Sequence, residues 1–195
     1  MDTKGIEQIE VGPATSADLP SIAEIFTHYV VNSVITFEET APSVPFWQQR
    51  LDSLSSSGLP FLVAKTTKDG ANEVVGYAYA SPWRNKPAYR YTVEDTVYLA
   101  PGWTGRGVGS ALLKRLLKEC QRAGKRQVIA VMSDTGSNAS AALHRRFGFK
   151  DAGRLTGVGY KHGTWVDTVL MQRELPAERL TETSNNTVPT SGIRG

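Results

Sequence analysis

A cluster of glycines directly ahead of an amphipathic helix is the feature that most constrains this fold. Residues 102–109 hold four glycines, and the segment before them, 90–101, has the β-branched and aromatic residues of a strand. After them, apolar side chains recur at helical spacing: Val108, Leu112, Leu113, Leu116, Leu117 and Cys120. Residues 127–133 form a continuous apolar run, which is typical of a buried strand. A strand, a glycine loop, a helix and a buried strand in this order predict a βαβ crossover.

The rest of the chain places this unit in a mixed sheet. We expect a first strand at 8–13, a helix capped by Thr15 and Asp18 that reaches Val30, and a second helix near 44–56. Further strands are expected at 60–66, 73–82, 149–160 and 165–173, with a short helix at 138–147. The order β-α-α-β-β-β-α-β-α-β-β begins with antiparallel strands. It predicts an α/β fold with a mixed, predominantly antiparallel sheet and helices on both faces.

Length and composition fit one folded domain. The chain has 195 residues, of which 40% are hydrophobic and 21% charged. We expect a single domain over 1–175 and a polar, disordered tail over 176–195. The formal net charge is only +3 and the basic residues are scattered, so we expect no nucleic-acid partner. With a single cysteine, no signal peptide and no apolar run long enough to span a bilayer, we expect a cytoplasmic protein without a membrane partner.

Three nucleotide-binding loops can be compared with the glycine cluster. A Walker loop ends in Gly-Lys-Ser/Thr, but here Gly107 is followed by Val108 and Gly109. A dinucleotide loop needs an acidic residue about 20 residues further on, where this chain has 122–127. The kinase glycine loop joins two strands, whereas this loop opens a helix. Backbone N–H groups at a helix N-terminus remain, and they form an anion site suited to a pyrophosphate. A turn without a ligand is the alternative, and the entropic cost of four glycines argues against it.

The segments around the loop resemble a known family. "DTVYLAPGWTGRGVGSALLKRLLKEC" and "NASAALHRRFGF" resemble the acetyl-coenzyme-A-binding core of the GNAT superfamily of N-acetyltransferases. Gly107-Val108-Gly109 matches the end of the family's glycine motif, while Thr104 stands where the family usually has Gln or Arg. "PATSADLPSIAEIFTHYVVNSVITFEE", "YAYASPWRNKPAYRYTVEDTVY" and "GYKHGTWVDTVLMQREL" resemble the phosphinothricin and methionine sulfoximine N-acetyltransferase branch. Together these blocks cover roughly residues 9–175.

The resemblance implies a GNAT-type fold, acetyl-CoA as co-substrate and direct attack of an amine on the thioester. It implies that Glu94 accepts the proton of the amine, and that His144 protonates the departing thiolate or helps to bind the acceptor. A surface salt bridge is the alternative for Glu94, and a packing or capping role is the alternative for His144. Asp95 should point to the opposite face of the sheet from Glu94 if the strand is regular. The histidines show no metal-ligand spacing, so we expect no metal site.

The resemblance and the glycine loop together imply two sets of binding residues. The cofactor set follows the strand, the loop and the later helix: Val97, Tyr98, Leu99, Thr104, Gly105, Arg106, Gly107, Val108, Gly109, Ser110 and Asn138. A plain helix cap is the alternative for Asn138. The implied acceptor is a small molecule with an α-carboxylate and a polar tetrahedral side group. Arg84 and Arg90 would hold its carboxylate, and Phe37 and Tyr91 would wall the pocket. Surface salt bridges are the alternative for both arginines, and the branch also implies a homodimer.

Two other functions stay open at this point. Acetylation of protein N-termini, peptides or other small amines uses the same fold, because a fold does not determine the acceptor. A coenzyme-A-binding sensor without catalysis would be favoured if Glu94 pointed away from the thioester. The segment "SPWRNKPAYRYT", which contains Trp83, indicates a closed small-molecule site rather than an open groove for a peptide.

Overall fold

One mixed sheet forms the centre of the molecule. The structure is a computed structural model that describes residues 8–68 and 71–177. Its seven strands have the order β1-β2-β3-β4-β5-β7-β6. Their bounds are β1 (Ile9–Pro13), β2 (Phe61–Lys68), β3 (Ala71–Pro82), β4 (Thr92–Leu99), β5 (Gln127–Ser133), β6 (Lys150–Lys161) and β7 (Thr164–Glu174). Neighbouring strands are antiparallel except β4 and β5, which are parallel. Of the predicted tail, residues 178–195 lie outside the described residues.

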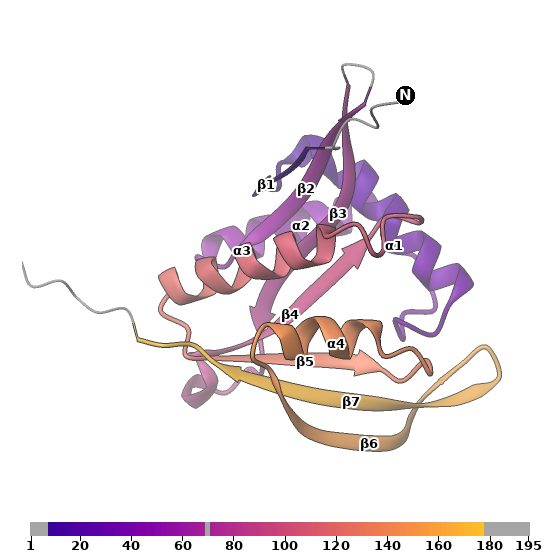
Figure 1. The fold of residues 1–195 in the computed structure, drawn as a ribbon, viewed down its shortest axis with the longest axis vertical. Helices are drawn as coiled ribbons and strands as arrows, with labels where there is room; N and C mark the ends of the chain where they lie inside the picture. The colour runs from indigo at the N-terminus through magenta and orange to yellow at the C-terminus, as the bar shows by residue number, and fades with distance from the viewer. Residues whose placement is uncertain (1–7, 69–70, 178–195) are drawn as a thin grey trace, which may run out of the picture.

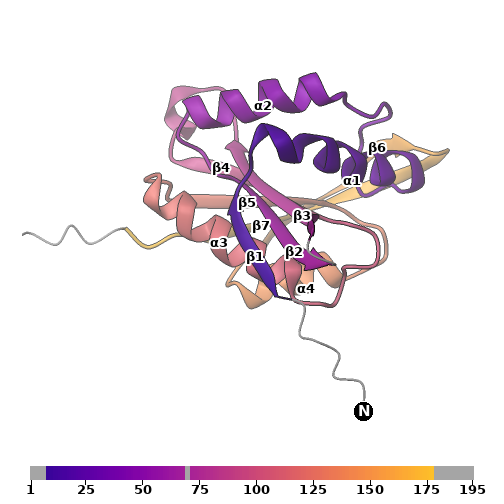
Figure 2. The ribbon, with the colours of Figure 1, turned by 90° about the horizontal axis from the view of Figure 1, so that it is seen from above.

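Helices cover both faces of this sheet. They are α1 (Leu19–Asn32), α2 (Val44–Ser56), α3 (Val108–Arg122) and α4 (Ala139–Arg146), with short 3-10 turns at Ser16–Asp18 and Pro87–Tyr89. Figures 1 and 2 show α1 and α2 on one face, and α3 and α4 on the other. The order of elements and the helices on both faces confirm the fold predicted from the sequence. Within the described ranges, no helix combines the length and the apolar character needed to cross a membrane.

The start of the first helix differs slightly from the expectation. The Thr15 amide donates a hydrogen bond to the Asp18 carboxylate over 2.9 Å, as the predicted capping pair requires. The residues between them form a 3-10 turn, however, and α1 itself begins at Leu19. Asp18 also forms an ion pair with Lys65 of β2 over 2.7 Å. The capping residue therefore ties the beginning of α1 to the sheet.

Helix α3 packs through a continuous apolar stripe. Leu112, Leu113 and Leu116 are fully buried against the sheet. Each such leucine contributes about 1.5–3 kcal/mol relative to an exposed one. Cys120 continues the stripe, and burial raises the pKa of its thiol to about 12. Since the thiolate is the nucleophilic form of cysteine, this residue belongs to the core and not to the chemistry.

An aromatic cluster fills the opposite face. Trp47 of α2 is only 1% exposed, and it meets Phe26 of α1 and Tyr77 of β3 edge to face, at ring-centroid distances of 5.4 and 5.6 Å. Such pairs contribute about 0.5–1.5 kcal/mol beyond their buried area. The cluster therefore holds both helices on the strands that lie beside the site.

The sheet opens between its two parallel strands. β4 and β5 pair only over residues 92–95 and 127–130. Beyond this point β4 continues along β3, while β5 continues along β7, and Figure 1 shows the two strands diverging. In the described part of the chain, the edge of β4 at 96–99 that faces β5 has no strand partner. The glycine loop follows directly after this edge.

Candidate active site

The glycine loop has the backbone of a turn that only glycine adopts easily. Gly102, Gly105 and Gly107 have φ angles of 82°, 79° and 84°, in the left-handed region that disfavours residues with a Cβ. Gly107 is the N-cap of α3. The first N–H groups of a helix have no partner within the helix, and residues 104–107 are exposed. The loop therefore presents exposed backbone and the positive end of the α3 dipole to a ligand.

Gly109 has a different role from these three. A Cβ at this position would lie 3.2 Å from the Leu143 side chain and 3.7 Å from the Leu99 side chain. Val108 and Gly109 are both buried. Gly109 therefore allows α3 to pack closely against α4 and β4. Beside it, Ser110 is half-buried, while the Arg106 guanidinium lies 4.8 Å from the centre of the Trp103 ring.

Glu94 lies where β4 and β5 separate. It pairs with Ser81 of β3 and Ile129 of β5, one residue before the β4–β5 pairing ends. Its side chain is half-buried. Burial raises the pKa of its carboxyl above the ordinary value, and the charge of Asp95 adds to this, while Arg50 and Arg84 partly oppose it. A partly desolvated carboxyl group with a raised pKa at the apex of an opening has the properties of a general base.

Arg50 of α2 belongs to this site and was not predicted from the sequence. Its Nη1 donates to the Tyr79 hydroxyl over 3.4 Å, and its guanidinium lies 5.1 and 5.2 Å from the Phe46 and Tyr79 ring centres. Its buried Nε has no hydrogen-bond partner. One signal was available: Arg50 follows the buried Trp47 by three residues, which places a cation on the face that the helix buries.

The two predicted acceptor arginines occupy different surroundings. Arg84 lies over the Trp83 ring at 5.0 Å, and its charge acts on Glu94. Arg90 donates to the Pro87 carbonyl over 3.2 Å and lies over the Tyr91 ring at 4.6 Å, and its own carbonyl accepts a bond from Lys125. Both arginines line a cavity of about 380 Å³ at the beginning of β4. The structure thus brings Arg84 toward Glu94, and it places Arg90 and Tyr91 beside the α3–β5 turn.

Comparisons with known proteins decide the family. The chain matches the acetyltransferase (GNAT) family over residues 22–149. The chain belongs to this family. It is 46% identical to a phosphinothricin N-acetyltransferase from Alcaligenes faecalis over 82% of this chain and 79% of that protein. It is 37% identical to an L-methionine sulfoximine/L-methionine sulfone acetyltransferase from Pseudomonas aeruginosa over 84% of this chain and 92% of that protein.

A solved structure supports the same assignment. The crystal structure of a GNAT superfamily phosphinothricin acetyltransferase from Sinorhizobium meliloti, in complex with acetyl-CoA, has a TM-score of 0.79 against this chain. The two are 42% identical, and the match covers 95% of each chain. The predicted family and its branch are confirmed, and so is the GNAT fold of this acetyltransferase.

His144 of the acetyltransferase lies on the opposite face of the sheet from Glu94. It is 4% exposed, and its Nδ1 and Nε2 lie 2.7 Å from the Ser140 carbonyl oxygen and 2.9 Å from the Asp95 carboxylate. Because the Ser140 carbonyl and an ionised Asp95 carboxylate both accept hydrogen bonds, this geometry favours the protonated imidazole, which can donate from both ring nitrogens. Burial lowers the pKa of His144, but the hydrogen bond and charge of Asp95 and the Ser140 carbonyl outweigh it, so the pKa is raised. This geometry supports the packing alternative for His144. It also fits the predicted opposite orientation of Glu94 and Asp95.

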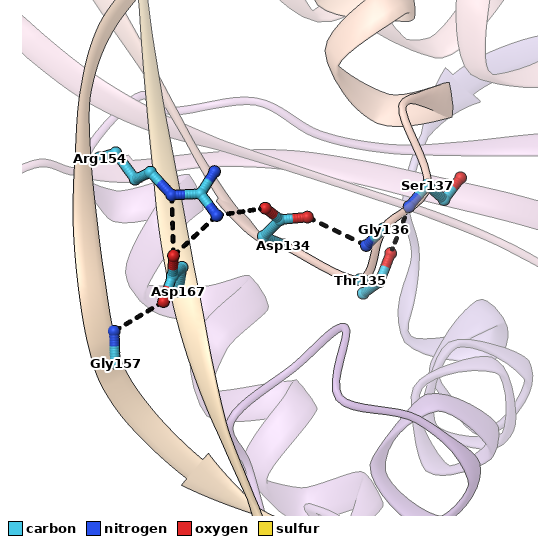
Figure 3. Close-up of polar contacts among 7 residues, drawn as sticks. All are labelled: Asp134, Thr135, Gly136, Ser137, Arg154, Gly157 and Asp167. Carbon is cyan, nitrogen blue, oxygen red and sulfur yellow. Dashed lines mark hydrogen bonds and ion pairs between the residues drawn. The ribbon is translucent and has the colours of Figure 1, made fainter.

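Asn138 follows a loop that a charged cluster holds in place. Arg154 of β6 forms ion pairs with Asp134, at the end of β5, over 2.6 Å and with Asp167 of β7 over 2.7 Å. Asp134 also accepts a bond from the Gly136 amide over 3.0 Å (Figure 3). The Asn138 side chain is exposed and makes no capping hydrogen bond. The cluster therefore fixes the β5–α4 loop. Asn138 occupies the N-cap position of α4, but without a side-chain capping bond, so its role stays a prediction.

Proposed function

We propose that this acetyltransferase transfers the acetyl group of acetyl-CoA to the amine of a small amino-acid-like acceptor, of the phosphinothricin or methionine sulfoximine type, with Glu94 as general base. One observation carries the proposal. The half-buried Glu94 carboxyl, with its raised pKa, lies where β4 and β5 separate, one residue before the β4–β5 pairing ends, and the charges of Arg50 and Arg84 act on it. The named activities of the relatives support the choice of acceptor.

The residues present fit acetyl-CoA as the co-substrate. Gly105 and Gly107 have no atom within 4 Å of the position of a Cβ, so the backbone of the loop is open to a pyrophosphate. The free edge at 96–99 offers main-chain groups to the amides of the pantetheine arm, and we propose that Val97 to Leu99 use it in this way. The Leu99 carbonyl already accepts a bond from the Tyr29 hydroxyl over 2.7 Å. Thr104, Arg106, Ser110 and Asn138 are proposed to complete the contacts.

The chemistry requires a proton acceptor. An α-amine has a pKa of about 8 and is mostly protonated at neutral pH. We propose that Glu94 removes this proton, directly or through a water. The neutral nitrogen then bonds to the acetyl carbonyl carbon, and the carbon–sulfur bond breaks to release the thiolate. The second proton that the nitrogen loses on forming the amide protonates this thiolate, which gives coenzyme A. Acetyl-CoA supplies the activated acyl group. No acetyl-enzyme intermediate is needed, and the buried Cys120 is unsuited to form one.

The acceptor assay tests the proposed function. Thiol release from acetyl-CoA is measured with phosphinothricin, methionine sulfoximine, methionine sulfone, free amino acids, polyamines and short peptides. We expect the first three to have the highest kcat/KM. A preference for peptides would instead support the N-terminal acetyltransferase alternative. Tight acetyl-CoA binding without turnover of any amine would support the sensor.

Gly107→Val tests the phosphate site. A Cβ at φ 84° strains the loop, and the added side chain covers its amides. We expect the acetyl-CoA Kd, measured by calorimetry, to rise at least tenfold, which is about 1.4 kcal/mol. Gly124→Val is the matched control, because Gly124 also has a positive φ of 70° but lies at the far end of α3. Equal Kd values for the two variants would refute the assignment. Gly109→Val is a poorer test because it would also clash with Leu143.

Arg84→Ala tests the acceptor side. Charged hydrogen bonds contribute about 1.5–3 kcal/mol, so we expect the acceptor KM to rise by about tenfold or more, with the acetyl-CoA Kd nearly unchanged. Arg90→Ala should act in the same direction but less strongly, because Arg90 is already bonded to Pro87 and stacked on Tyr91. Loss of acetyl-CoA binding with an unchanged acceptor KM would contradict this placement of the pocket.

We also propose three properties that do not depend on the geometry of the active site. Exposed apolar side chains on β6 and β7 support a homodimer, which sedimentation equilibrium can measure: Leu155, Val158, Tyr160 and Trp165. The single cysteine supports a cytoplasmic location. The continuous sheet supports a single domain over 1–175.

A further inference from the structure

The α1–α2 loop is held by the sheet at three successive residues. The Ile35 carbonyl accepts a bond from Ser133 of β5 over 3.1 Å, and the Thr36 carbonyl accepts one from Lys161 of β6 over 2.8 Å. The ring of Phe37 lies directly against Gly159. Figures 1 and 2 show the turn of the β6–β7 hairpin on the same side of the molecule as the end of α1. Two distant strands therefore determine where this loop lies.

Lys161 is an unusual residue to bury. It is 2% exposed, whereas lysine is almost never fully buried unless it is paired. Burial lowers the pKa of its ammonium, and the charges of Glu39 and Glu38 only partly oppose this. In the part of the chain that the structure describes, the Lys161 ammonium donates a hydrogen bond to the backbone carbonyl of Thr36 and not to a carboxylate. The ammonium therefore holds the loop at Thr36.

Gly159 provides space for the Phe37 ring. A Cβ at Gly159 would lie 2.3, 2.4 and 2.7 Å from three carbons of the ring. Gly159 is not among the residues with positive φ, so its backbone does not require glycine. β6 returns to regular pairing with β7 at this residue, after an irregular stretch that begins at Leu155. The absence of a side chain here therefore serves the contact with Phe37.

The loop also lies against the face of β4 that carries Glu94. The Thr36 side chain lowers the pKa of the nearby Tyr98 hydroxyl, although burial raises it more, and Tyr98 points to the same face as Glu94 because the two are four residues apart on one strand. Phe37 itself is 39% exposed. One part of its ring lies against Gly159, and the rest is exposed.

We propose that Gly159 and Lys161 are positioning residues that fix the Phe37 ring as a wall of the acceptor pocket, so that Gly159 limits the size of the acceptor side group. The proposal rests on the proposed function. Gly159 sets how deeply the ring sits on β6, and Lys161 holds the preceding carbonyl. Any side chain at 159 would push the ring outward into the space for the acceptor.

A double-mutant cycle tests this inference with the panel of small acceptors. Gly159→Ala should raise the KM of phosphinothricin by about tenfold, with kcat and the acetyl-CoA Kd within about twofold of wild type. Phe37→Leu in the Gly159→Ala background should restore much of the KM, because the smaller side chain gives back the space. Lys161→Met, which keeps the apolar stem without the donor, should raise the KM in the same direction.

Gly153→Ala is the matched control on the same strand, because a Cβ there would make only an ordinary contact, at 3.9 Å from Leu170. Additive KM effects of Gly159→Ala and Phe37→Leu would overturn the inference, and so would an equal change in Gly153→Ala. Thermal unfolding of the same variants measures the coupling free energy between residues 37 and 159 in the absence of an acceptor. If wild type turns over no small acceptor, the proposed function fails. If wild type is active and the KM effects are uncoupled, only this inference fails.

Discussion

Glu94→Gln should lower kcat/KM at pH 7 by about 10²- to 10⁴-fold, the usual contribution of a general base. Glutamine keeps the shape of the side chain and its hydrogen-bonding capacity, but it cannot accept the proton of the amine. The fold and the acetyl-CoA Kd should stay nearly unchanged, because Glu94 precedes the free edge at 96–99 that is proposed to bind pantetheine. Thiol-release kinetics and calorimetry measure the two quantities separately.

The pH dependence of this loss gives a stricter test. Burial raises the pKa of Glu94, so the wild-type rate should fall with decreasing pH through a value above the ordinary 4.5 of a glutamate. In Glu94→Gln the defect should shrink toward pH 9, because the amine then loses its proton to solvent. Glu73→Gln, at an exposed position on β3, is the control. Near-normal activity at pH 7, or a defect that stays constant up to pH 9, would mean that the proton leaves by another route.

His144→Ala should lower the free energy of unfolding by about 3–5 kcal/mol, as expected when one partner of a buried ion pair is removed. The variant leaves the Asp95 carboxylate buried, and one of its oxygens already has no hydrogen-bond partner in the wild type. Denaturant unfolding monitored by fluorescence measures the change. His28→Ala, at an exposed position of α1, should stay within about 0.5 kcal/mol of wild type.

The sign of the pH effect on stability follows from the raised pKa of His144. A group whose folded pKa lies above its unfolded value, here 6.5, adds stability that is fully present below that unfolded value. The contribution is lost as the pH rises through the folded pKa. The stability difference between wild type and His144→Ala should therefore be larger at pH 6 than at pH 9. A small stability change with a large loss of kcat would restore the thiolate-protonating role predicted from the sequence.

The sequence by itself determined the fold, the family and the use of acetyl-CoA. The helical stripe through Leu112 and Leu116, the buried strand at 127–133 and the glycines at 102–107 are local patterns, because periodicity and left-handed backbone depend on near neighbours. The glycine loop and the blocks around it then carried the resemblance that the comparisons confirmed. The roles of Glu94 and the other site residues stay predictions.

Only the tertiary structure decided which side chains meet. The charge of Arg50 acts on Glu94 from another layer, and His144 pairs with Asp95 across 49 positions of the chain. Phe37 rests on Gly159 because the hairpin folds back against the α1–α2 loop. Such contacts depend on how helices and strands pack and not on any local pattern. The type of a charged residue therefore indicates the chemistry that it can perform. Its partner is known only once the tertiary structure places the distant element on which that partner lies.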